Sequence, residues 1–171
     1  MAVTFPSPEW FQDAQFASSQ SQEQREASLK KAFDAARGNA RLLVLDPGLI
    51  SPAGHHFSHD HALTQAAHRL GMPALVIGFR ELEERVWQTL PVLRHFHVHP
   101  YGKPDVHASA EQDFSTLNEM VLHDLMHLPV QVSDADVVLF PTVTQNQLLA
   151  IAAWMMQMNA QHRCPHVRIG L

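Results

Sequence analysis

Five short apolar runs, separated by segments with helical character, constrain the fold of this chain more than any other feature. The runs are residues 41–46, 73–78, 92–99, 136–140 and 166–171. The clearest of them are continuously apolar, whereas a strand with one face in solvent alternates apolar and polar residues. The sequence therefore predicts strands of a parallel sheet that is covered on both faces.

Helical segments separate these runs. Apolar spacing and capping residues predict helices over residues 22–37, 55–70, 111–128 and 144–160, and the short charged segment 80–89 is also expected to be helical. Strand and helix thus alternate with short connections, which is typical of α/β proteins. We expect a doubly wound, mostly parallel five-stranded sheet of the Rossmann-like type, preceded by an N-terminal arm and helix.

Two of these helices carry predictions about their packing. The helix over residues 55–70 is expected to face the sheet with Leu63, Ala66, Ala67 and Leu70. The helix over residues 144–160 is apolar nearly all round in its middle, so we expect it to be sandwiched between other elements.

The chain divides into three parts by composition. Residues 1–21 are polar and contain two prolines, which indicates a loosely ordered arm. Residues 22–38 form an N-terminal helix, and residues 39–171 form the Rossmann-like α/β domain. Because the last residue lies in a predicted strand with no covering helix after it, we expect this domain to be truncated at its C-terminal end.

Charge and cysteine content limit the class of partner and the compartment. The chain has 12 Lys and Arg against 17 Asp and Glu, a formal charge of −5, which argues against nucleic acid as a partner. No apolar run approaches the roughly 18 residues of a membrane span, and the N-terminus lacks the features of a signal peptide. With Cys164 as the single cysteine, the sequence predicts a cytoplasmic protein and a small buried thiol.

Two loops are candidate binding sites, because ligands of open parallel sheets bind beyond the carboxyl ends of the strands. The first loop, residues 46–56, offers Gly54, His55 and His56. The alternative for this loop is a turn glycine followed by two solvated histidines.

The second loop, residues 140–147, offers Thr142, Thr144, Gln145 and Asn146. Amide side chains both donate and accept hydrogen bonds, which suits sugar hydroxyls. The alternative is a well-capped helix start, because both threonines have the capping-box spacing to a glutamine.

The sequence gives little support for a metal site, a nucleotide-binding loop or a nucleophilic active site. The 13 histidines fall into clusters whose spacing does not place enough ligands together, so we expect no functional metal, although residues 119–127 could take up zinc or nickel adventitiously. There is no G-x-G-x-x-G, P-loop or G-x-S-x-G motif. The sequence thus predicts no cofactor and leaves the catalytic residues unassigned.

Several segments resemble the N-terminal domain of bacterial GT-B glycosyltransferases. These are the strand 42–46, the loop that ends in Gly54, His55 and His56, the helix that closes with residues 69–73, and the strand and loop 136–146. The resemblance implies a Rossmann-like half of a GT-B fold that binds a sugar or glycan acceptor. It also implies that both loops line the cleft, and that a nucleotide-sugar donor binds only with a second domain, supplied by a donor-domain partner or within a homo-oligomer.

Two other interpretations remain open at this point. A stand-alone flavodoxin-like binding or regulatory module without catalysis would need no more than five strands. A histidine-based metal protein would hold stoichiometric zinc.

Overall fold

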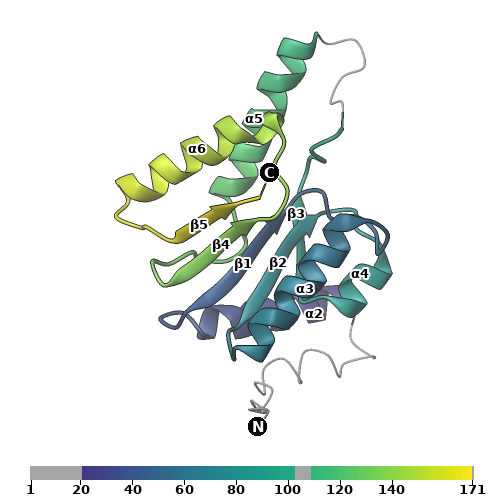
Figure 1. Cartoon of the computed structure of the whole chain (residues 1–171), viewed down its shortest axis with the longest axis vertical. Helices are drawn as coiled ribbons and strands as arrows, with labels where there is room; N and C mark the ends of the chain where they lie inside the picture. Colours follow the sequence, from purple (N-terminus) through teal and green to yellow (C-terminus); the bar gives the residue numbers. More distant parts are fainter. Residues whose placement is uncertain (1–20, 103–108, 171) are drawn as a thin grey trace.

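The computed structural model describes residues 21–102 and 109–170, and in this part of the chain five parallel strands form one sheet. The strands are β1 (Arg41–Asp46), β2 (Ala74–Phe79), β3 (Val92–Phe96), β4 (Asp136–Phe140) and β5 (His166–Ile169). Their order is β3-β2-β1-β4-β5, which places the first strand at the centre (Figure 1). This is the Rossmann-like order, in which the chain reverses its direction of travel between β1 and β4.

Helices cover both faces of the sheet, so the predicted doubly wound α/β fold is confirmed. The helices are α2 (Gln22–Ala35), α3 (His55–Arg69), α4 (Glu84–Thr89), α5 (Ala110–Met126) and α6 (Gln145–Ala160). α3 and α4 pack on one face, and α2, α5 and α6 contribute to the core on the other. The predicted N-terminal helix is present, with Ser21 as its cap, whereas the predicted arm lies almost wholly outside the described residues.

The central strand β1 shows why continuous apolar runs were the right signal. All six of its residues are buried. Leu43 and Leu45 belong to the core under α2, α5 and α6, whereas Leu42 and Val44 belong to the core under α3 and α4. A strand whose alternate side chains pack into two different cores is expected to be apolar at consecutive positions.

A buried ion pair joins the amino ends of β1 and β4. The Arg41 guanidinium donates to both carboxylate oxygens of Asp136, from Nε at 2.8 Å and from Nη2 at 2.7 Å. It also donates to the carbonyl oxygens of Phe33 and Gln131, at 2.7 and 2.9 Å. Both charged side chains are 0% exposed. One arginine therefore connects α2, β1, β4 and the segment before β4.

Two packing predictions were wrong. Helix α6 packs on α5 and the sheet with one face, while Leu149 is 60% exposed and Met156 is 74% exposed on the opposite side. No described element covers that outer face, so α6 is not sandwiched. Cys164 is an exposed free thiol, because it lies in the turn before the edge strand β5 and not in the core.

None of the described helices combines the length and the apolar character that crossing a bilayer requires.

Candidate functional site

The candidate site lies beyond the carboxyl ends of the strands, where helix α5 projects past the sheet (Figure 1). The first residue of α5 that is buried is Leu117, so the preceding turns of the helix leave the core. The start of α6, which follows β4, faces this projecting part of α5. The start of α6, the projecting part of α5 and the segment after β3 therefore form the walls of a cleft. The cleft lies at the edge of the sheet where open parallel sheets bind ligands.

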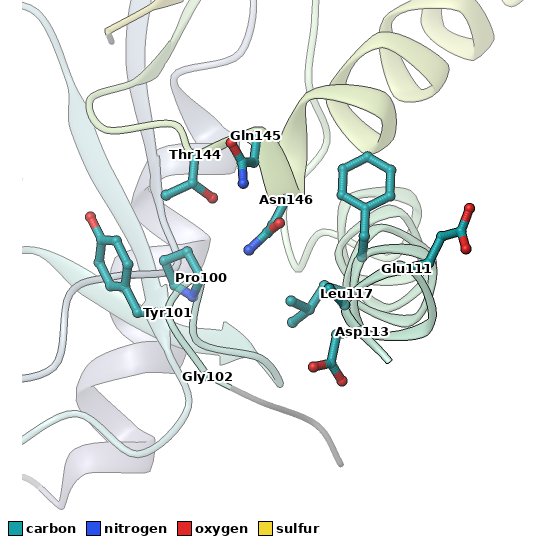
Figure 2. A pocket seen from close by; sticks show the side chains of 11 residues that line it. Pro100, Tyr101, Gly102, Glu111, Asp113, Leu117, Thr144, Gln145 and Asn146 are labelled. Carbon is teal, nitrogen blue, oxygen red and sulfur yellow. The ribbon is translucent and has the colours of Figure 1, made fainter. Parts of the chain in front are cut away.

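This cleft has a volume of about 940 Å³. Its polar and charged side chains come from three separate segments, and Figure 2 shows Tyr101 on the side opposite α5. The lining residues are Pro100, Tyr101, Gly102, Ala110, Glu111, Asp113, Phe114, Leu117, Thr144, Gln145 and Asn146. The cleft thus combines apolar and aromatic surface with hydroxyl, amide and carboxylate groups, which is the usual make-up of a ligand pocket.

The wall formed by α6 is held in place by its own capping residues. Thr144 is the N-cap, and its backbone N–H donates to Oε1 of Gln147 at 2.8 Å. Gln147 is 1% exposed, so its amide serves the cap and not a ligand. The next two side chains, Gln145 and Asn146, are left to face the cleft, and the Asn146 amide reaches into the space between Pro100 and Leu117 (Figure 2).

The opposite wall is a tight turn after β3. The backbone N–H of Gly102 donates to the carbonyl oxygen of His99 at 2.9 Å, and the N–H of Tyr101 donates to Nδ1 of His99 at 3.3 Å. The rings of His99 and Tyr101 lie 5.2 Å apart. The His99 side chain therefore fixes the turn that presents Tyr101 to the cleft.

His99 must be neutral to hold this turn, because a protonated Nδ1 cannot accept a hydrogen bond. Burial lowers the pKa of His99, and the neighbouring His56 lowers it further. Asp46 and the hydrogen bond to the Gly48 backbone act in the opposite direction but do not outweigh the first two effects. The neutral ring thus accepts from Tyr101 at physiological pH.

Behind the turn, the end of β1 holds a buried carboxylate–imidazole pair. The Asp46 carboxylate is fully buried and lies 2.8 and 2.9 Å from Nδ1 of His56. It also accepts the backbone N–H of Gly48 at 2.9 Å. The bond to Asp46 assigns the proton to Nδ1 of His56, and Nε2 is buried without a hydrogen-bond partner among the described residues. His56 therefore fixes the loop between β1 and α3.

A second acid, Asp60, lies one helical turn after His56 and is also fully buried. Burial and the neighbouring Asp46 carboxyl raise the pKa of Asp60 from 3.8 to about 9. Among the described residues, its oxygens have no partner other than the Asp46 carboxyl. Asp60 is thus a protonated, neutral acid at pH 7 that can donate its proton to Asp46.

The close approach of Gly48 to His56 gives a direct test of this arrangement. A Cβ atom at Gly48 would lie 2.2 Å from Cε1 of His56, so the ring would have to leave Asp46. We expect Gly48→Ala to lower the free energy of unfolding by about 1–3 kcal/mol, measured by urea denaturation. In a His56→Ala background the same change should cost much less. Equal costs in both backgrounds would contradict the proposed clash.

The structure brings together some of the predicted site residues. Thr144, Gln145 and Asn146 line the cleft, whereas Thr142 is half-buried outside it. Gly54, His55 and His56 do not line it. They lie next to it through Tyr101, whose ring centroid is 6.2 Å from that of His56. Both loops therefore share the carboxyl edge of the sheet, and their contact with a ligand stays a prediction.

The sequence did not identify two parts of the cleft lining, the segment after β3 and the start of α5. The predicted strand over residues 92–99 included His99, but β3 ends at Phe96, because the next backbone N–H, of His97, donates to the Asp124 carboxylate. Tyr101 and Asp113 had no motif to mark them. The signal that could have identified Tyr101 is its position, because it follows a parallel strand and so belongs at the ligand edge.

Among residues 21–102 and 109–170, no group of three or more His, Cys, Asp or Glu side chains is placed to hold a metal ion. Two exposed histidines at the C-terminal end of α5 illustrate this. His123 and His127 stack with ring centroids 4.4 Å apart, and Nδ1 of His127 bonds to the carbonyl oxygen of His123.

Comparison of the chain with models of known protein families, with curated proteins and with solved structures finds no match.

Proposed function

We propose that this chain binds a sugar or glycan in the cleft, as the acceptor-binding half of a GT-B glycosyltransferase whose nucleotide-sugar donor is bound by another domain. One observation carries the proposal: hydroxyl, amide and aromatic side chains from three segments converge on one cleft at the carboxyl edge of a Rossmann-like sheet. The cleft also adjoins the point where strand order reverses, between β1 and β4.

The chemistry of the cleft suits a sugar. Gln145 and Asn146 present groups that both donate and accept hydrogen bonds, as sugar hydroxyls also do. Tyr101 is 55% exposed, so its ring offers a flat surface on which the apolar C–H face of a sugar can pack. Phe114, which is half-buried, adds apolar surface on the α5 side of the cleft.

The arrangement also accommodates more than one sugar unit. Tyr101 lies between the cleft and the loop of Gly54 to His56, and the exposed His55 ring is only 4.1 Å from the ring of His56. A glycan that extends past Tyr101 would reach His55. The two loops that resemble glycosyltransferase loops would then act on one ligand.

The test replaces the two amides and measures sugar binding. We expect Asn146→Ala to weaken binding of neutral mono- and oligosaccharides by about tenfold, with a similar or smaller loss for Gln145→Ala, because each removes hydrogen bonds to the ligand. Titration of the ¹⁵N-labelled chain by NMR measures affinities in the weak range expected of single sugars and locates the residues that respond.

Asn159→Ala is the matched control, since this asparagine lies at the opposite end of the same helix and is exposed. It should leave sugar binding unchanged. Equal effects of the variants at the two ends, or no sugar binding by the unaltered chain, would contradict the proposal. Transfer from or hydrolysis of a nucleotide sugar by this chain alone would contradict its assignment to the acceptor side.

A further inference from the structure

A second pocket lies beside the outer strand β3 and shares no lining residue with the cleft. Its volume is about 480 Å³, which is in the range of small-molecule sites. Arg80 and His97 each directly follow the last residue of a strand, β2 and β3, and these two strands are neighbours (Figure 1). Both side chains therefore belong to the edge of the sheet where ligands bind. The pocket is lined by Arg80, His97, Glu119, Met120, His123 and Asp124.

A buried carboxylate holds the His97 ring in one orientation. Asp124 is 1% exposed, and its Oδ1 atom lies 2.8 Å from Nδ1 of His97. Its Oδ2 atom accepts the backbone N–H of His97 at 2.8 Å, and this second bond alone is enough to end β3. The bond to the ring assigns the proton to Nδ1, so Nε2 carries a free lone pair. Because the His97 side chain is 47% exposed, Nε2 is left for a ligand.

The other basic groups of the pocket leave it open to an anion. The Arg80 guanidinium contacts the carboxylate of the adjacent Glu81 at 3.3 Å, which is a surface pair of little strength. Nδ1 of His123 lies 3.5 Å from the same Asp124 oxygen that holds His97. The buried acid thus faces the two imidazoles from below, and the arginine is free to take a second partner.

We propose that this pocket binds the phosphate group of a small phosphate monoester, between the Arg80 guanidinium and Nε2 of His97. A guanidinium donates two parallel hydrogen bonds to a phosphate. A phosphate monoester has a second pKa of about 6, so it exchanges one proton near neutral pH. Its P–OH group donates to Nε2 of the neutral ring, or the charged ring donates to its P–O⁻ group. The half-buried Met120 offers apolar surface to the organic part of the ligand.

One side chain opposes this inference and gives its sharpest test. Glu119 lines the same pocket, is exposed, and accepts the Ser115 hydroxyl at 3.3 Å. Its carboxylate repels a bound phosphate. We expect Glu119→Gln to raise the affinity for a phosphate monoester by about threefold. A residue that only stabilises the fold would not strengthen binding when it is replaced.

The experiment titrates the ¹⁵N-labelled full chain with phenyl phosphate, phenyl sulfate and phenol at pH 7, followed by NMR. We expect phenyl phosphate to bind about tenfold more tightly than phenyl sulfate, which has less charge and no exchangeable proton. Phenol, which has no anionic group, should bind most weakly. Arg80→Gln and His97→Gln should each lower the affinity for phenyl phosphate by about tenfold, and the resonances that shift should be those of the pocket.

Arg85→Gln is the matched control, since Arg85 is an exposed arginine of α4 outside the pocket, and it should leave the affinity unchanged. Equal losses for Arg80→Gln and Arg85→Gln would overturn the inference, as would equal binding of the phosphate and sulfate esters. Lack of phenyl phosphate binding, or shifts confined to other parts of the chain, would also overturn it. None of these outcomes bears on sugar binding in the cleft, because the two sites share no lining residue.

Discussion

Replacing Asp60 with asparagine is expected to make the protein more stable near neutral pH. Asp60 is 0% exposed, and burial together with the adjacent Asp46 raises its pKa from 3.8 to about 9. At pH 7 the folded chain therefore keeps a proton on Asp60 that the unfolded chain releases above about pH 4. Because the folded state binds more protons in this range, the free energy of unfolding falls as the pH rises from about 4 to 9.

Asparagine removes this dependence, because it is neutral in both states and its amide can still donate to Asp46. We expect Asp60→Asn to match the unaltered chain near pH 4 and to exceed its free energy of unfolding by about 2–4 kcal/mol at pH 7. Urea denaturation followed by circular dichroism across this pH range measures the difference. A variant that is less stable at pH 8, or that keeps the original slope with pH, would show that Asp60 is ionised in the folded protein.

The opposite result is expected at another buried aspartate, Asp136. Asp136→Asn leaves the Arg41 guanidinium, which is 0% exposed, without a counter-charge. Removing one partner of a buried ion pair typically costs about 3–5 kcal/mol, so we expect a loss of that size in the free energy of unfolding. The same urea denaturation, at pH 7, measures it.

The surface pair of Arg80 and Glu81 supplies the control, since its side chains are 52% and 67% exposed and 3.3 Å apart. Glu81→Gln should change the free energy of unfolding by less than about 0.5 kcal/mol. Replacing both buried partners, as in Arg41→Met with Asp136→Leu, should recover much of the loss, because no unpaired charge then remains. A cost for Asp136→Asn no larger than that of the surface control would disprove the role assigned to the pair.

The strands were predictable because they depend on local patterns. The bounds of β1 and β4 agree with the predicted runs to the residue, since each strand has a continuous apolar stretch and is followed directly by a proline. The helix starts at Ser21 and Thr144 were predictable for a similar reason. A capping box connects residues only three positions apart, so the signal lies within one turn.

Helix α3 shows where local patterns fail. The predicted inner face included Leu70, which is 72% exposed, whereas the buried residues are Asp60, Thr64 and Ala67. Apolar spacing cannot identify a buried aspartate, because its burial depends on a proton that Asp46, at the end of the preceding strand, helps to retain. Thr64 is accommodated by donating its hydroxyl to the Asp60 carbonyl oxygen at 2.8 Å.

The cleft was predictable from one side only. Gln145 and Asn146 were identified because they follow a strand and begin a helix, which is where the topology places ligands. Asp113 faces them from a helix that was predicted correctly, but the sequence does not show that this helix begins beyond the edge of the sheet. How far a helix extends past its sheet depends on the length of the segment before it and on its packing against a neighbour, here α6.

The projecting part of α5 lines the cleft but does not pack in the core, whereas the rest of the helix packs in the core. Before Leu117 none of its described residues is fully buried, so side chains there contribute little to the core, although Ser109 and Gln112 cap the helix. Under the proposed function, we expect substitutions in these turns outside the capping box to alter ligand preference with little loss of stability. If the cleft is the binding site we propose, changes of ligand preference should arise first in that projecting stretch of α5, because the strands beneath it are constrained by the core on both faces.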